Sequence, residues 1–221
     1  FGISNKVGVS TYLAGKASVD EIIQPSGKLP TLDVLTAGPV PPNPAELIAS
    51  DRCTQLFSEL KERYDYIFID CAPGGETLMN TNALVASDYV IVPTEAGIYS
   101  LQGLPRLLAY INKVRTQLRC KVSILGYLLI RWNANRQISK EVKAYYSNPE
   151  EVKAPLFPVH IRECVRCTES VAHEMSLFEY APDSTAADDY MRIAEHMIGR
   201  KARPKTWTPM KWGQLANSAF R

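Results

Sequence analysis

An aspartate at the end of an apolar run is the residue of this chain whose position most directly suggests chemistry. Asp70 follows residues 66–69 (Tyr-Ile-Phe-Ile) and precedes the small-residue turn 71–73 (Cys-Ala-Pro). An apolar run without polar alternation is typical of a strand buried on both faces of a parallel sheet. At the carboxyl end of such a strand, a carboxylate can hold Mg²⁺ or its water beside a nucleotide phosphate. The sequence therefore predicts Asp70 as a catalytic and metal-binding residue; an aspartate that simply caps the turn is the alternative.

Two further apolar runs, with a helix between them, supply elements that would position this aspartate. Residues 89–93 (Tyr-Val-Ile-Val-Pro) predict a second buried strand that is closed by proline, and residues 122–130 predict a third. Residues 101–118 carry leucine, isoleucine and valine at helical spacing. The order strand, helix, strand predicts an α/β fold with a parallel twisted sheet, right-handed crossovers and helices on both faces.

Several motifs occur in a characteristic order between about residues 60 and 199. They are residues 65–73 (DYIFIDCAP), 82–95 (NALVASDYVIVPTE), 100–104 (SLQGL), 125–133 (LGYLLIRWN), 161–166 (IRECVR) and 178–184 (FEYAPDS). Together they resemble the ParA/MinD family of deviant-P-loop ATPases, nearest its ParA (Soj-like) DNA-partitioning branch. Residues 9–17 and 32–64 are also similar to the bacterial tyrosine kinases of polysaccharide export, a sister group in the same superfamily.

The resemblance implies a fold, an activity and partners. Residues 1–199 would form a P-loop NTPase-like domain that uses ATP and Mg²⁺, and residues 200–221 would form a basic tail containing Trp and Pro. The family forms a nucleotide-sandwiched homodimer, binds nonspecific DNA in that state and works with a centromere-binding ParB-like protein. Carried onto this chain, the resemblance assigns four residues to the cofactor: Asp70, Pro73, Asn133 and Arg162.

Basic residues are the candidates for DNA contacts. The net charge of the 221 residues is only +2, so the overall charge does not indicate a nucleic-acid partner. Arginines and lysines nevertheless cluster after the predicted strands and near the C-terminus, and clusters that share a face bind phosphates nonspecifically. A solvated surface is the alternative. Arg166 falls at the last arginine of the family pattern Ile-Pro-Arg-Asn-Val-Arg, and the predicted DNA-binding set is Arg166, Lys140, Arg200 and Lys201.

The phosphate loop of the family is absent from the given residues. Neither G-x-x-x-x-G-K-[ST] nor the deviant K-G-G-x-x-x-K-[ST] occurs in them, although such a loop is needed to cradle the phosphates. Residues 5–11 (NKVGVST) resemble a shortened loop, but we favour a short helix beginning near Ser10, with Tyr12 and Leu13 inward. We expect the first βα unit, with its loop, upstream of Phe1. A remnant that hydrolyses nothing and acts as a binding module is the alternative.

Cysteines and hydropathy bear on the cellular compartment. Cys164 and Cys167 have the spacing of a redox or half-zinc motif, but no second pair or histidine doublet completes a metal site. We therefore expect reduced thiols in a cytoplasmic, nucleoid-associated protein. No apolar run approaches the ~20 residues that cross a bilayer, so we predict no membrane partner.

The remaining elements leave some alternatives open. Prolines in residues 38–44 predict a loop that leads into a helix near Ala45. Asn133 could contact a base or cap a helix beginning near Gln137, and Trp132 is predicted to pack. Residues 186–198 predict a last amphipathic helix that ends at Gly199. A tyrosine-kinase-like or a MinD-like regulatory ATPase is a further alternative to partitioning. The tail disfavours both, because it has no tyrosine and contains two prolines.

Overall fold

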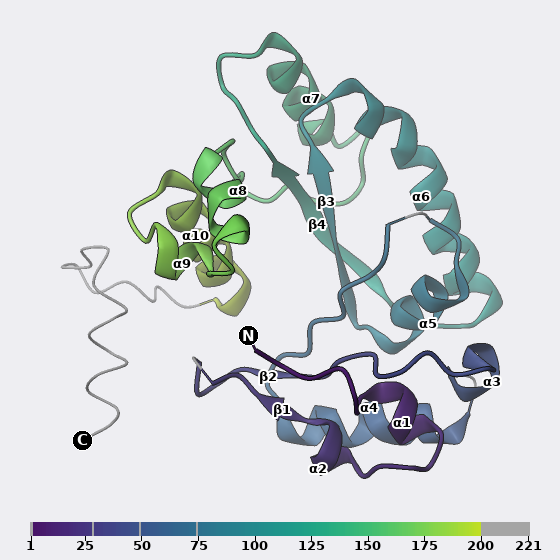
Figure 1. The fold of residues 1–221 in the computed structure, drawn as a ribbon. Coiled ribbons are helices and arrows are strands. Elements are labelled where there is room, and N and C mark those ends of the chain that lie inside the picture. Colours follow the sequence, from purple (N-terminus) through teal and green to yellow (C-terminus); the bar gives the residue numbers. More distant parts are fainter. Residues whose placement is uncertain (1, 28, 49, 74, 200–221) are drawn as a thin grey trace. The chain divides into compact units, whose positions relative to one another are not determined.

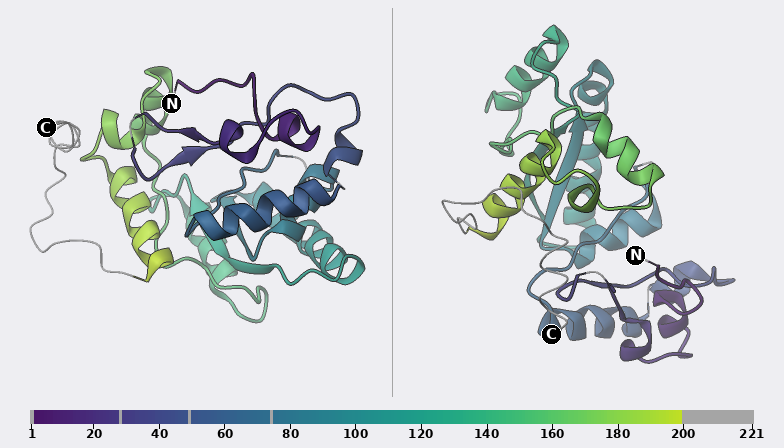
Figure 2. Two further views of the ribbon diagram at one scale, coloured as in Figure 1. Left: turned by 90° about the horizontal axis from the view of Figure 1, so that it is seen from below. Right: turned by 60° about the vertical axis from the view of Figure 1, so that its left-hand side comes forward.

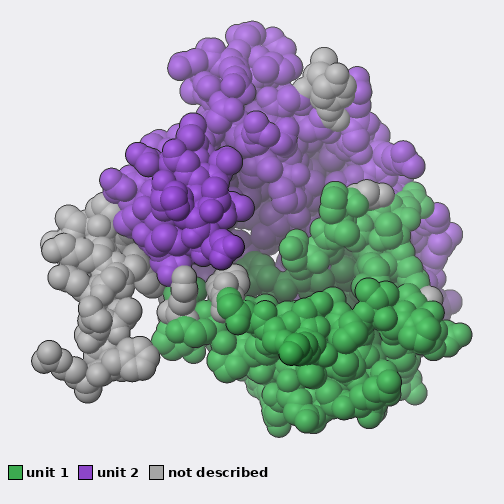
Figure 3. Space-filling model, in the orientation of Figure 1, with its two compact units in different colours: residues 1–86 green, residues 87–221 purple. Residues whose placement is uncertain are grey.

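A computed structural model describes residues 2–27, 29–48, 50–73 and 75–199 of the chain. Contacts divide the molecule into two compact units, Phe1–Ala86 and Ser87–Arg221, which are coloured separately in Figure 3. The prediction of one domain over residues 1–199 stays a prediction, and the predicted tail of residues 200–221 lies outside the described residues.

The first unit is mainly helical, as Figure 1 shows in purple and blue. Its strands β1 and β2 are two residues long and pair in antiparallel fashion. The elements in order are α1 (Val9–Leu13), α2 (Val19–Ile22), β1 (Gln24–Pro25), β2 (Asp33–Val34), α3 (Pro44–Ile48), α4 (Asp51–Arg63) and α5 (Leu78–Ala86). Helix α3 begins where the prolines of residues 38–44 end, so the predicted loop and helix start are confirmed.

The core of this unit forms around α4. Leu56 and Leu60 lie one helical turn apart and pack in one buried cluster with apolar residues of α1 and α2. Tyr12 and Leu13 of α1 are both buried, which confirms the predicted short helix with these side chains inward. The Arg52 guanidinium lies 4.7 Å from the centre of the Tyr12 ring and its Nε donates to the Tyr12 carbonyl at 3.0 Å. These contacts fix α1 on α4.

Residues 66–69 form no strand, and the prediction of a strand buried on both faces is wrong. Tyr66 is 55% exposed and Phe68 is 76% exposed. A strand inside a sheet needs hydrogen-bonded neighbours for its backbone N–H and C=O groups. Among the described residues, no strand pairs with this segment. The apolar sequence gives the segment its strand propensity, but burial depends on partners that the local pattern does not contain.

The second unit contains a parallel pair of strands with a helical crossover. Its elements in order are β3 (Tyr89–Glu95), α6 (Ile98–Gln117), β4 (Ser123–Ile130), α7 (Gln137–Ser147), α8 (Val165–Ala172), α9 (Leu177–Tyr180) and α10 (Thr185–Ile198). Strands β3 and β4 are parallel and pair along their whole length, from Tyr89 opposite Ser123 to Glu95 opposite Ile130. A bulge between Val90 and Ile91 shifts the register once. The predicted strand, helix, strand order is therefore confirmed in this unit. Gly199, with φ of 63°, ends α10 as predicted.

A third segment extends this sheet beside β4. Single parallel bridges join Tyr127 to Leu156 and Trp132 to Arg162. The Tyr127 N–H donates to the Pro155 carbonyl and the Phe157 N–H donates to the Tyr127 carbonyl, both at 2.9 Å. The adjacent residue of β4 is a glycine because a Cβ there would lie only 2.9 Å from the Pro155 oxygen and the Phe157 ring.

Helices cover both faces of this sheet, as the α/β prediction requires. Tyr127 and Leu129 of β4 pack with Leu104 of α6 and Val142 of α7. Leu128 lies between these two residues, so its side chain is on the opposite face of the strand. It packs in a different cluster that includes residues of α10. Figures 1 and 2 show α6 and α7 apart from the helices α8 to α10 around the β3–β4 pair. In the described part of the chain, no helix combines the length and the hydropathy needed to cross a membrane.

Strand β3 continues beyond the proline that was predicted to close it. Pro93 lies inside the strand, opposite Leu128 of β4, and pairing continues to Glu95. Proline cannot donate a backbone hydrogen bond, but it is tolerated in a strand that is paired on one side only. Among the described residues, β3 pairs only with β4. The predicted end at Pro93 is therefore wrong by two residues.

Candidate functional site

Charged residues lie at the carboxyl ends of the two parallel strands. Glu95 is the last residue of β3, and Arg131 directly follows β4. An Nη1 atom of Arg131 lies 3.3 Å from Oε1 of Glu95, and both side chains are exposed. Arg131 has φ of 52°, so the chain turns sharply as it leaves the strand. This is the edge of a parallel sheet at which ligands bind in open α/β folds.

Asn133 lies just beyond this turn and interacts with the neighbouring segment. Its Nδ2 donates to Oε2 of Glu163 at 3.3 Å, and its Oδ1 accepts from the Asn135 N–H at 3.0 Å. Arg136 contacts the same Glu163 oxygen at 2.9 Å. Arg136 itself is the N-cap residue of α7, so the alternative in which Asn133 caps this helix is wrong. The assignment of Asn133 to the nucleotide base stays a prediction.

Arg162 forms several polar contacts with α10. Its Nε and Nη2 atoms donate to the two carboxylate oxygens of Asp189, each at 2.8 Å. Its backbone N–H also donates to Asp189 at 3.0 Å, and Nη2 reaches the Thr185 carbonyl at 3.2 Å. Asp189 is buried and only 2% exposed, and its carboxylate raises the pKa of the Arg162 guanidinium. The pair joins the segment beside β4 to α10.

This geometry bears on the prediction that Arg162 binds the cofactor. The guanidinium is 43% exposed, so one edge remains accessible, but its principal partner is Asp189. The cofactor assignment stays a prediction. Sequence reasoning missed Asp189, although a signal was present. Asp189 lies three residues after Ala186 and four before Ile193, on the buried stripe of an amphipathic helix.

Trp132 is a packing residue, as predicted. Its ring packs against the main core cluster of the second unit. The centre of its ring also lies 5.2 Å from the centre of the His160 ring and 5.5 Å from Nζ of Lys143. The indole therefore contacts a histidine of the segment beside β4 and a lysine of α7.

The described residues of the predicted DNA-binding set are exposed. Lys140 lies on α7 and is exposed. Arg166 lies on α8, is 58% exposed and forms an ion pair of 3.0 Å with Glu169, one helical turn away. The Tyr180 hydroxyl donates to the same glutamate at 3.2 Å. Arg200 and Lys201 lie outside the described residues, and the DNA-binding assignments stay predictions.

Asp70 belongs to the first unit, where it precedes a turn held by Asn80. Asp70 and Pro73 are exposed. Nδ2 of Asn80 donates to the Ala72 carbonyl at 3.2 Å and to the Gly75 carbonyl at 2.9 Å. Asn80 Oδ1 is buried without a hydrogen-bond partner in the described structure. Sequence reasoning missed Asn80, which fixes the turn that follows the candidate carboxylate.

The carboxylate of Asp70 is a suitable ligand for a hard cation whose other ligands are phosphate oxygens and water. Carboxylate oxygens are the ligands that Mg²⁺ prefers, and proteins usually supply one or two of them while phosphate and water complete the octahedron. Among the described residues, no group of three or more His, Cys, Asp or Glu side chains could hold a metal alone. The assignment of Asp70 to a magnesium site that is shared with phosphate and water stays a prediction.

The two clustered cysteines lie at the start of α8. Cys164 is the N-cap residue and Cys167 is the third helical residue. Both are free thiols. Burial, and next the charge of Cys164, raise the pKa of the Cys167 thiol, which makes it a poor nucleophile at neutral pH. The expectation of reduced thiols in a cytoplasmic protein stays a prediction.

Comparison with known proteins identifies the family of the chain. The profile of the AAA domain family matches residues 9–124. The chain is 33% identical over 150 residues to the sporulation initiation inhibitor protein Soj of Bacillus subtilis, covering 66% of this chain and 56% of Soj. It is 31% identical over 139 residues to the chromosome-partitioning ATPase Soj of Thermus thermophilus, covering 63% and 55%. The chain thus spans little more than half the length of these relatives.

A solved structure agrees with the fold. The septum site-determining protein MinD of Pyrococcus horikoshii, complexed with Mg-ADP, superposes with a TM-score of 0.60 over 89% of this chain and 74% of MinD. The sequences are 19% identical, so this likeness concerns the fold alone. It supports the α/β architecture with parallel strands.

Proposed function

The chain belongs to the AAA domain family, in its ParA/MinD group of ATPases, and from that premise we propose that it binds ATP with Mg²⁺ and acts in DNA partitioning. The observation that carries the proposal is the exposed carboxylate of Asp70 beside a turn that Asn80 holds through two hydrogen bonds. The Soj relatives, one of them a chromosome-partitioning ATPase, support the choice of process.

Asp70 has the central role in this proposal. Bound Mg²⁺ would neutralise the charge of the phosphate oxygens during phosphoryl transfer. Asp70 would hold one position in the magnesium shell, directly or through a water. Asn133 offers an amide that can donate to and accept from an adenine edge, once its bond to Glu163 is exchanged for the base.

The proposed DNA contacts use exposed basic residues. Arg166 is paired with Glu169 on the surface, and a surface pair of this kind contributes only about 0.2–1 kcal/mol. Exchange of Glu169 for a DNA phosphate therefore costs little. We assign nonspecific DNA binding to Arg166 and Lys140, with Arg200 and Lys201 as further contacts. An ATP-dependent homodimer, a ParB-like partner and nucleoid association complete the proposal.

The hydrolysis test compares two aspartates that flank the same apolar run. Asp70→Ala in the full-length protein should abolish Mg²⁺-dependent ATP hydrolysis, because the magnesium shell loses its protein ligand. Asp65→Ala removes the same charge at an exposed position before the apolar run, and this variant should retain turnover. Circular dichroism checks that both variants keep their fold. Equal turnover in the two variants would remove Asp70 from the mechanism.

A further inference from the structure

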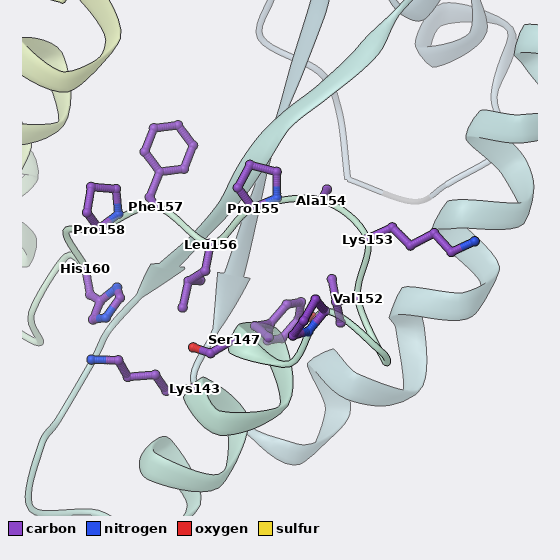
Figure 4. A pocket seen from close by; sticks show the side chains of 12 residues that line it. Lys143, Ser147, Val152, Lys153, Ala154, Pro155, Leu156, Phe157, Pro158 and His160 are labelled. Carbon is purple, nitrogen blue, oxygen red and sulfur yellow. The ribbon is translucent and has the colours of Figure 1, made fainter.

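An open cavity of about 540 Å³ lies in the second unit, between α7 and the segment that joins β4 as a third strand. Figure 4 shows this cavity from close by, with the side chains of the 12 residues that line it. Its volume is within the range of about 300–1,000 Å³ that is typical of small-molecule sites. The proposed ATP site does not use any of its lining residues.

One wall of the cavity is polar and cationic. Figure 4 shows the amino group of Lys143 beside the His160 ring, with the hydroxyl group of Ser147 turned toward the same side. The Trp132 ring fixes this arrangement, because it contacts both the lysine and the histidine. Lys153 also lines the cavity but points away from this group. Three hydrogen-bonding side chains from two segments therefore line the same cavity.

The charge of this wall is not compensated within the cavity. None of the 12 lining residues is acidic. The nearby carboxylate of Asp189 is already bound by Arg162. Burial, and next the charge of Lys143, lower the pKa of the His160 ring, while Asp189 acts in the opposite direction. His160 Nδ1 is buried without a hydrogen-bond partner in the described structure.

The rest of the lining is largely apolar and stiff. It includes Val152, Pro155, Leu156 and Pro158. Proline has a fixed φ and leucine and valine lose little further freedom on contact, so an apolar ligand body would bind there at low entropic cost. Small-molecule sites typically combine such an apolar surface with a few convergent polar groups.

We propose that this cavity binds a small organic anion, a phosphate ester or carboxylate with an apolar body, whose acidic group contacts Lys143, Ser147 and His160. The apolar body lies against Leu156 and the prolines. The site is separate from the ATP site, and it would give the protein a second small-molecule ligand.

Phenyl phosphate and benzoate are suitable probes because they share an apolar ring and differ in the acidic group. Each is titrated into the full-length protein while the His160 ring signals are followed by NMR, since the chain has only three histidines. His160→Phe identifies the signal. We expect a saturable shift with at least one probe, and the tighter probe identifies the acidic group of the ligand. Saturating MgATP should leave this binding unchanged.

Two lysine variants decide the assignment. Lys143→Met should weaken probe binding by about tenfold or more, because it removes a charge-assisted hydrogen bond. Lys121→Met removes the same charge at an exposed position outside the cavity and should bind the probes like the unmodified protein. Three results would overturn the proposal: no saturable shift with either probe, equal affinities in the two lysine variants, or displacement of the probe by MgATP.

Discussion

Arg162 and Asp189 form a two-pronged ion pair in which both carboxylate oxygens lie 2.8 Å from guanidinium nitrogens. The two partners differ in burial, since Asp189 is buried and Arg162 is partly exposed. Water can solvate the arginine if its partner is lost, but it cannot reach the aspartate. The contact holds the segment beside β4 on α10. Loss of the arginine and loss of the aspartate are not equivalent, because only the arginine can be solvated.

This asymmetry predicts unequal effects on stability. Arg162→Met leaves a buried carboxylate without its cation and should lower the free energy of unfolding by about 3 kcal/mol or more. Asp189→Asn should cost less, because the remaining arginine keeps contact with water. Arg166→Met, which removes an exposed pair, should cost under about 1 kcal/mol. Urea unfolding measures all three, and equal losses for Arg162→Met and Arg166→Met would contradict this account.

Gly126 is predicted to be the glycine of β4 that tolerates no side chain. Gly126→Ala places a Cβ 2.9 Å from the Pro155 oxygen and the Phe157 ring, and such overpacking should lower the free energy of unfolding by about 1–3 kcal/mol. Gly103→Ala in α6 meets nothing within 4 Å and should be neutral or stabilising, since alanine favours helix. Thermal unfolding compares the two, and a tolerated Gly126→Ala would show that the third strand does not pack there.

The His160 ring provides a pH-dependent term. Burial and Lys143 lower its pKa from the ordinary value of 6.5, while Asp189 acts in the opposite direction. The folded state then binds the proton less readily than the unfolded state, so this histidine makes the protein lose stability as pH falls below about 6.5. NMR titration should show the low pKa rising in Lys143→Met and unchanged in Lys121→Met. An unshifted His160 in the unmodified protein would refute the environment described here.

The elements of the second unit could be predicted from sequence because their signals are local. Residues 101–118 carry the helical period of α6, and residues 122–130 carry the apolar run of β4. Residues 66–69 carry an equally strong apolar run but form no strand. Whether such a run is buried depends on strands far away in sequence, which local patterns do not describe.

The candidate site was predictable only in part, for a similar reason. Residue types and order pointed to Asp70 and Asn133. Asn80 bonds the Ala72 carbonyl in the turn after Asp70, and Asn133 bonds Glu163, which lies thirty residues away. Glu163 occupies a position where the ParA pattern has arginine, so the family pattern gave no indication of this bond.

Nucleotide-dependent DNA binding tests the central claim most directly. The full-length protein is titrated onto duplex DNA of unrelated sequence at several salt concentrations, with MgATP or MgADP, and compared with Arg166→Ala and with Lys121→Ala as the control. We predict tight binding with MgATP that fades with MgADP. The slope of log affinity against log salt should be smaller by about 0.9 in Arg166→Ala, because one phosphate contact is lost, and unchanged in Lys121→Ala. Binding that is indifferent both to the nucleotide and to Arg166 would contradict a role in DNA partitioning.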